Sequence, residues 1–148
     1  MSEFMADIVK CWNLYGSSYI AGAGRTLMFS LVGTFIGCII GFVVGIVQTI
    51  PLSKNDPAPK KILIKFVKAI MRIYVEVFRG TPMIVQAVFI YYGARMLFDI
   101  KMGMWFSAFF VVSINTGAYM AETVRGGINS IDPGQTEGAK AIGMTHFQ

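Results

Sequence analysis

The sequence predicts an all-α, polytopic transmembrane protein, and three observations support this fold class. Hydrophobic residues make up 55% of the 148 positions, and the mean hydropathy of +0.60 exceeds that of ordinary water-soluble domains. No Asp, Glu, Lys or Arg occurs from Thr26 to Pro51, a run longer than the roughly 20 apolar residues that cross a bilayer core. The charged residues gather beside such apolar runs rather than being spread evenly along the chain.

The segment 1–24 is mixed in character and is predicted to be an interfacial N-terminal segment. It carries Trp12, Tyr15 and Tyr19 among glycines, a composition typical of a segment lying at a membrane surface. A frayed terminus fits the same residues equally well. Acidic residues precede the first Lys, and no cleavable signal pattern follows, so the first span is expected to direct insertion itself.

The first span is predicted over residues 26–50 and ends at Pro51, which cannot continue a helix. Its glycines recur every four residues, so they form a strip without side chains along one helix face. The alternative, that glycines occur at random in a membrane span, explains the regular four-residue spacing less well. We therefore expect another helix to pack closely against this strip. The four glycines are Gly33, Gly37, Gly41 and Gly45.

A polar loop at 53–61 and the stretch after it set the predicted topology. Six cations in this region face the single acid Asp56, which by the positive-inside bias places the loop in the cytoplasm. The N-terminus is then outside, and the protein is a multi-pass component of a cytoplasmic membrane. The six cations are Lys54, Lys60, Lys61, Lys65, Lys68 and Arg72.

The stretch 62–98 is too long for one straight span, and a break is predicted near 79–82. There the sequence reads Arg-Gly-Thr-Pro, and proline removes a helical hydrogen bond and disfavours helical geometry in the residue before it. A short external loop follows at 95–103, and the next span is expected at 104–124. The predicted transmembrane domain therefore covers 25–126.

The remaining segment, 127–148, is too polar to span a membrane. Asp132-Pro133-Gly134 is a helix-start signal, so we expect a helix on the cytoplasmic side.

Catalytic, cofactor and metal sites are not indicated by the residues. The single histidine, His146, has no acidic or thiol partner nearby in sequence and is expected at the surface. Gly22 and Gly24 are not followed by the Lys-Ser or Lys-Thr of a phosphate-binding loop. Cys11 and Cys38 are too few for a disulfide framework. The net charge of +5 does not indicate nucleic-acid binding, because the cations do not alternate with stacking aromatics.

Charged and polar groups within or beside the spans are the better functional candidates, because each is costly in lipid without a partner. Glu76 and Arg79 are three residues apart, as are Glu122 and Arg125, a spacing that suits ion pairs. Such pairs either anchor helix ends or, with Arg79 beside the break, gate a path for a polar solute. Uncharged polar groups serve either as glue between helices or as solute contacts. The candidates for a path or gate are Arg79, Thr81, Pro82, Gln86, Asn115, Tyr119 and Glu122.

Three segments, in this order, resemble the permease subunits of ATP-binding cassette importers for polar amino acids, of the histidine/glutamine/arginine/cystine type. They are the break at 79–82 followed by Gln86, the stretch 115–128, and the stretch 134–144, which is similar to a Glu-Ala-Ala, three residues, Gly pattern. The resemblance implies the type I importer permease (MetI-like) fold. That fold has a five-helix core, so it is expected to be incomplete in this sequence, with a truncated C-terminal coupling loop.

The resemblance also implies the partners: a dimer of ATPase subunits, a second permease subunit in a homo- or heterodimer, an extracytoplasmic substrate-binding protein and an amino-acid substrate. ATP and Mg would bind to the partner ATPase, so this chain is not expected to be an enzyme or to bind a cofactor. Gly138 departs from the alanine usual in the coupling helix. Two alternatives stay open, a permease for another solute and a non-transporting scaffold that uses the same ATPase-docking helix. The implied coupling residues are Glu137, Gly138, Ala139 and Gly143.

Overall fold

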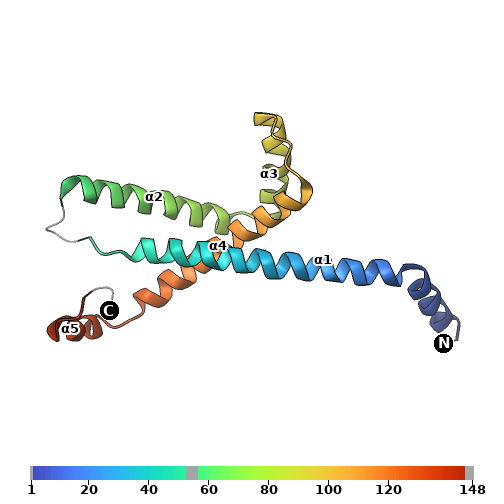
Figure 1. Cartoon of the computed structure of the whole chain (residues 1–148), viewed down its shortest axis with the longest axis horizontal. Coiled ribbons are helices and arrows are strands. Elements are labelled where there is room, and N and C mark those ends of the chain that lie inside the picture. The colour runs from blue at the N-terminus through green and yellow to red at the C-terminus, as the bar shows by residue number, and fades with distance from the viewer. Residues whose placement is uncertain (1, 53–56, 146–148) are drawn as a thin grey trace.

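The computed structural model describes residues 2–52 and 57–145, and within these ranges all regular structure is helical (Figure 1). Residues 53–56, the first part of the loop predicted at 53–61, and the single histidine, His146, lie outside the described residues. The helices are α1 (Ser2–Thr49), α2 (Ala58–Gly80), α3 (Met83–Phe98), α4 (Met104–Asn129) and α5 (Pro133–Ala141).

Two helices, α1 and α4, are each long and apolar enough to cross a membrane. Helices α2 and α3 are long and apolar enough only when they are taken together, and the chain bends by 111° between them. The described residues therefore contain up to three spans, if this bent pair is counted as one span. The segment 1–24, predicted as a separate interfacial piece, belongs to the same uninterrupted helix as the first span. At 1.5 Å per residue α1 is about 70 Å long, so it extends well beyond a hydrocarbon core of about 30 Å.

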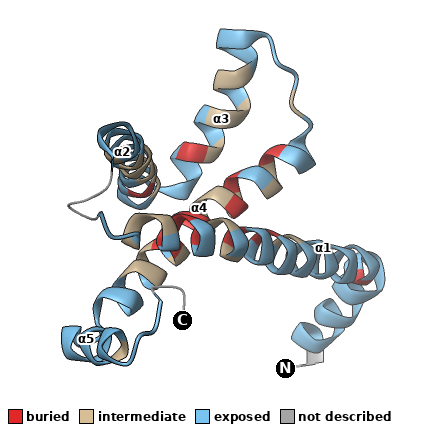
Figure 2. Ribbon diagram, turned by 60° about the vertical axis from the view of Figure 1, so that its left-hand side comes forward, coloured by how far each residue is buried: buried red, intermediate tan, exposed pale blue. Residues whose placement is uncertain are grey.

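The centre of the fold is the crossing of α1 and α4, where buried residues concentrate (Figure 2). A Cβ added at Gly41 would lie 2.5 Å from the carbonyl oxygen of Gly117, and one added at Gly37 would lie 2.8 Å from that of Ser113. Only residues without a side chain permit such an approach of two backbones. Gly37, Gly41 and Gly45 meet the α4 backbone in this way, whereas Gly33 faces the side chain of Val112.

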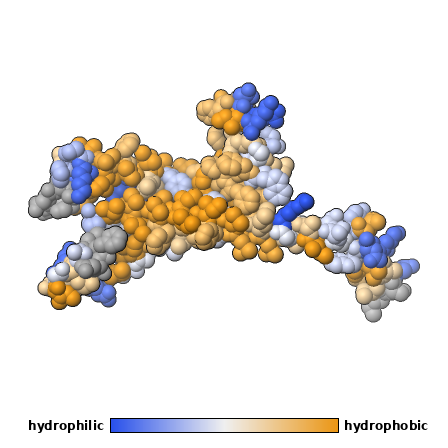
Figure 3. All heavy atoms as spheres, viewed as in Figure 1, coloured by the Kyte–Doolittle hydropathy of each residue, from blue (hydrophilic) through white to orange (hydrophobic). Residues whose placement is uncertain are grey.

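The apolar core is small, and most large apolar side chains point outward. Val44, Val75 and Ala121 are buried together, with Tyr74 and Ile40 packed against them. Figure 3 shows apolar residues covering the middle of the molecule and hydrophilic residues at its ends. This distribution is typical of a protein whose middle is surrounded by lipid and whose two ends are in water.

Candidate functional site

The break between α2 and α3 leaves backbone carbonyls without their helical partners. Pro82 has no N–H, so the carbonyl of Phe78, four residues earlier, cannot make its usual helical hydrogen bond. The hydroxyl of Thr81 donates to the carbonyl of Val77 at 2.8 Å. Such groups must find partners inside a membrane protein, because lipid supplies none.

Two amide side chains donate hydrogen bonds to the carbonyls at the break. Gln86 Nε2 donates to the Phe78 carbonyl at 2.9 Å and to the Thr81 carbonyl at 2.9 Å. Asn115, from α4, donates to the same Phe78 carbonyl at 3.2 Å and to Gln86 Oε1 at 3.1 Å. Gln86 is 7% exposed, so these bonds satisfy a buried group. This amide cluster (Thr81, Gln86 and Asn115) joins α2, α3 and α4 at the bend.

A second cluster is built around Glu122 on α4. Arg125 Nε donates to Glu122 Oε2 at 3.0 Å, and its Nη2 pairs with Oε1. Arg79, from α2, approaches Glu122 Oε2 at 3.7 Å and lies over the Tyr119 ring at 5.6 Å from its centroid. The expected pair between Glu76 and Arg79 is not present among the described residues. Arg79 instead pairs across to α4, so the charges link two helices.

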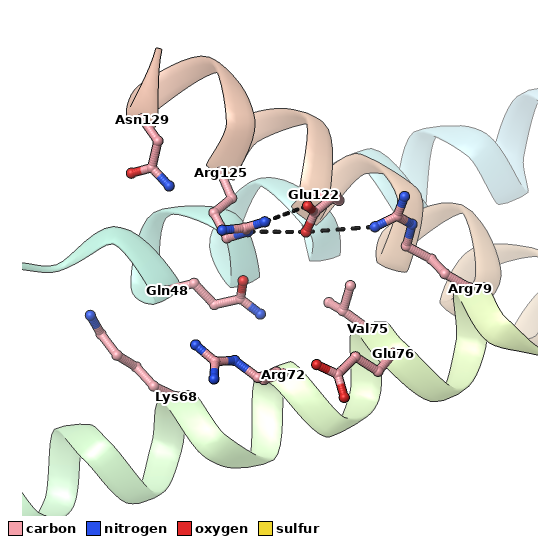
Figure 4. Close-up of a pocket in the computed structure, with 9 residues that line it drawn as sticks. All are labelled: Gln48, Lys68, Arg72, Val75, Glu76, Arg79, Glu122, Arg125 and Asn129. Atoms are coloured by element: carbon pink, nitrogen blue, oxygen red, sulfur yellow. Dashed lines mark hydrogen bonds and ion pairs between the residues drawn. The ribbon is translucent and has the colours of Figure 1, made fainter. Parts of the chain in front are cut away.

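These charges line a cavity of about 440 Å³ between α1, α2 and α4 (Figure 4). Four of the lining residues are cations and two are carboxylates. From α2, Lys68, Arg72, Glu76 and Arg79 line this cavity, whereas apolar residues of the same helix, such as Ile62 and Phe66, are exposed. The lining residues are Gln48, Lys68, Arg72, Val75, Glu76, Arg79, Glu122, Arg125 and Asn129.

The residues predicted for a path or gate therefore divide between two places. The amide cluster and Pro82 hold the helix break, whereas Arg79 and Glu122 line the charged cavity, with Tyr119 against Arg79. Sequence reasoning missed Tyr74, whose hydroxyl donates to the Ile114 carbonyl at 2.6 Å.

The ends of α5 follow directly from local sequence. Asp132 is the N-cap, and its Oδ1 accepts from the Gly134 N–H at 2.6 Å. At the other end, Gly143 adopts a φ of 82°, which favours glycine. Its N–H donates to the Lys140 carbonyl at 3.0 Å, and the N–H of Met144 donates to the Ala139 carbonyl at 3.0 Å. This pair of bonds is a Schellman C-cap.

The predicted coupling residues lie together on α5 and just after it. Glu137 and Gly138 are exposed and Ala139 is half-buried. A Cβ at Gly138 or Gly143 would meet nothing within 4 Å. The helix stands apart from α1 to α3 and follows the end of α4 (Figures 1 and 2). Its surface is therefore open in the described part of the chain.

Comparison with known proteins gives a family match over the second part of the chain. Residues 63–148 match the model of the binding-protein-dependent transport system inner membrane component. This range contains most of α2, the break, α3, α4 and α5.

Curated relatives match over about half of the chain. The putative glutamine transport system permease protein GlnP of Rickettsia prowazekii is 39% identical over 74 residues, which are 50% of this chain and 34% of that protein. The arginine transport system permease protein ArtQ of Bacillus subtilis is 40% identical over 73 residues, 49% of this chain and 33% of that protein. The match thus spans about a third of the length of these relatives.

A solved structure is similar over nearly the whole chain. It is a crystal structure of an amino acid ABC transporter with histidines, which has a TM-score of 0.75 and 33% sequence identity. The alignment covers 95% of this chain and 58% of the solved one. With a family match over more than half of its residues, this chain belongs to the family of binding-protein-dependent transport system inner membrane components.

Proposed function

We propose that the chain is part of a permease subunit that moves a polar amino acid across the bacterial cytoplasmic membrane. The observation that carries this proposal is the family match over residues 63–148, which includes the helix break, α5 and every residue lining the charged cavity except Gln48. Relatives named for glutamine and arginine transport and a solved amino acid transporter support the substrate class.

The energy for transport would come from partner ATPase subunits, which bind ATP and Mg, through contacts with α5. The exposed Glu137, the open space at Gly138 and the small side chain of Ala139 support such docking, because small residues allow a helix to pack closely in a groove. The left-handed backbone at Gly143 ends the helix sharply and exposes its last turn. An extracytoplasmic binding protein and a second permease subunit would complete the assembly.

The proposed topology places the N-terminus outside and the loop between α1 and α2 in the cytoplasm. The excess of cations around that loop supports it. A reporter fused at Lys60 should then read cytoplasmic, and one fused at Lys101 should read external. The opposite readings would invert the topology and place α5 on the side without ATPase.

Uptake competition tests the transport proposal. The protein carrying this sequence is produced with its ATPase and binding protein, and uptake of labelled glutamine, arginine and histidine is measured against excess amino acid, sugar or divalent metal ion. We expect only amino acids to compete. Preferential competition by a sugar or metal ion would refute the substrate class, and an assembled complex without uptake would indicate a scaffold rather than a transporter.

A further inference from the structure

The charged cavity offers more unused hydrogen-bond donors than acceptors. Glu122 is already engaged by Arg79 and Arg125 (Figure 4), so its capacity to accept further bonds is largely used. The Nε2 atom of Gln48 is buried and has no hydrogen-bond partner among residues 2–52 and 57–145. Leaving a buried donor of this kind without a hydrogen bond costs free energy. An acceptor-rich ligand would therefore complement this side of the cavity.

Two cations on α2 add to this donor excess. Arg72 makes no hydrogen bond or ion pair with another described residue, and it lies across from Gln48 in Figure 4. Lys68 donates to the carbonyl of Ile50 at 2.6 Å and keeps two further N–H groups. Glu76 is the remaining carboxylate in the lining. Because the lining has four cations and two carboxylates, the cavity favours an anion.

The position of the cavity narrows the choice of anion. Gln48 lies one residue before the end of α1, where the long apolar run of the first span ends and the basic loop begins. At this depth of a membrane, phospholipid phosphates are the abundant anions, and basic pockets between helices on the cytoplasmic side suit them. The outward face of α2 would meet the acyl chains. Its exposed apolar residues are Ile62, Leu63, Phe66, Ile70, Ile73 and Val77.

We propose that this cavity binds the phosphate of an anionic phospholipid, with Arg72, Lys68 and Gln48 as its donors. The bound headgroup would bridge α1 and α2 beside the Arg79–Glu122 pair. This binding requires neither the ATPase nor the amino acid, although the cytoplasmic position of the cavity rests on the topology proposed above.

Lipid binding to the protein carrying this sequence, purified and delipidated in detergent, tests this proposal. Native mass spectrometry measures the affinity for short-chain phosphatidylglycerol, with phosphatidylcholine as the neutral comparison. We expect phosphatidylglycerol to bind preferentially, and Arg72→Gln to weaken it about tenfold or more, because a charge-assisted bond is lost. Lys65→Gln removes the same charge from the same helix but outside the cavity, and should change the affinity less than about twofold. Arg72→Lys should retain most of the binding, because a lysine ammonium also binds phosphate as a point charge.

Three results would overturn the proposal. Equal affinity for the two lipids would show that the cavity does not select the anionic headgroup. A loss of affinity in Lys65→Gln equal to that in Arg72→Gln would show that only the overall charge of the protein matters. Displacement of the lipid by millimolar inorganic phosphate, or by glutamine or arginine, would assign the cavity to a soluble solute. A helical circular dichroism spectrum for Arg72→Gln, together with binding by Arg72→Lys, excludes misfolding as the cause of lost affinity.

Discussion

Replacing Gly41 by alanine tests the close crossing of α1 and α4. The added Cβ would lie 2.5 Å from both the Gly117 carbonyl oxygen and the Met120 Cβ, about 1 Å closer than a favourable contact. Because one of these neighbours is backbone, the two helices must move apart. Overpacking of this kind costs roughly 1–3 kcal/mol. Gly22→Ala is the matched control, since a Cβ there meets nothing within 4 Å.

Comparing Gly41→Ala with Gly22→Ala cancels the effect of helix propensity, because replacing glycine by alanine in a helix stabilises both variants by a similar amount, about 1 kcal/mol. Trp105 stacks on Phe29 with ring centroids 4.9 Å apart and reports on the contact between α4 and α1. In a Trp12→Phe background its fluorescence follows unfolding during SDS titration in mixed micelles. Gly41→Ala should be about 1–3 kcal/mol less stable than Gly22→Ala. Equal stability of the two variants would refute the packing argument.

Three further predictions concern the break and α5. Gln86→Leu should destabilise the chain by about 1–3 kcal/mol in the same titration, because it removes bonds to the carbonyls of Phe78 and Thr81; an unchanged unfolding curve would contradict this. Asp132→Ala should speed amide exchange in α5 about fivefold, because it removes an N-cap that stabilises the helix by about 1 kcal/mol. Asp132→Asn keeps a capping side chain and should leave the exchange rate unchanged, so equal rates in the two variants would exclude a capping role. Gly143→Ala should also speed exchange there, because a φ of 82° strains alanine by about 1–2 kcal/mol; wild-type exchange would show that the turn tolerates a side chain.

Features set by neighbouring residues were the most accessible to sequence analysis. The glycine strip follows from a four-residue repeat on one helix, and the break follows from the chemistry of Pro82. Asp132 caps the start of α5 through the N–H of Gly134, two residues away, as the helix-start signal predicted. Each of these features depends on rules of local geometry that apply before the chain has folded.

Features that depend on the three-dimensional arrangement were not accessible. Arg79 has Glu76 within reach along its helix, but it pairs with Glu122, because the crossing of α2 and α4 decides which carboxylate is near. The bend of 111° likewise has no local signal beyond the presence of a break. Continuation of α1 through the segment 1–24 was also missed, since aromatic and glycine residues suggested a boundary where no proline enforces one.

Crosslinking at α5 tests the central claim most directly, namely the proposal that this chain is part of a permease subunit driven by a partner ATPase. Ala139→Cys and, as control, Lys101→Cys are placed in the protein carrying this sequence, in membranes with its ATPase, after Cys11 and Cys38 are changed to serine. The account predicts a crosslink to the ATPase from position 139 and none from position 101. A crosslink from position 101 alone would contradict the coupling role of α5 and the topology that supports it.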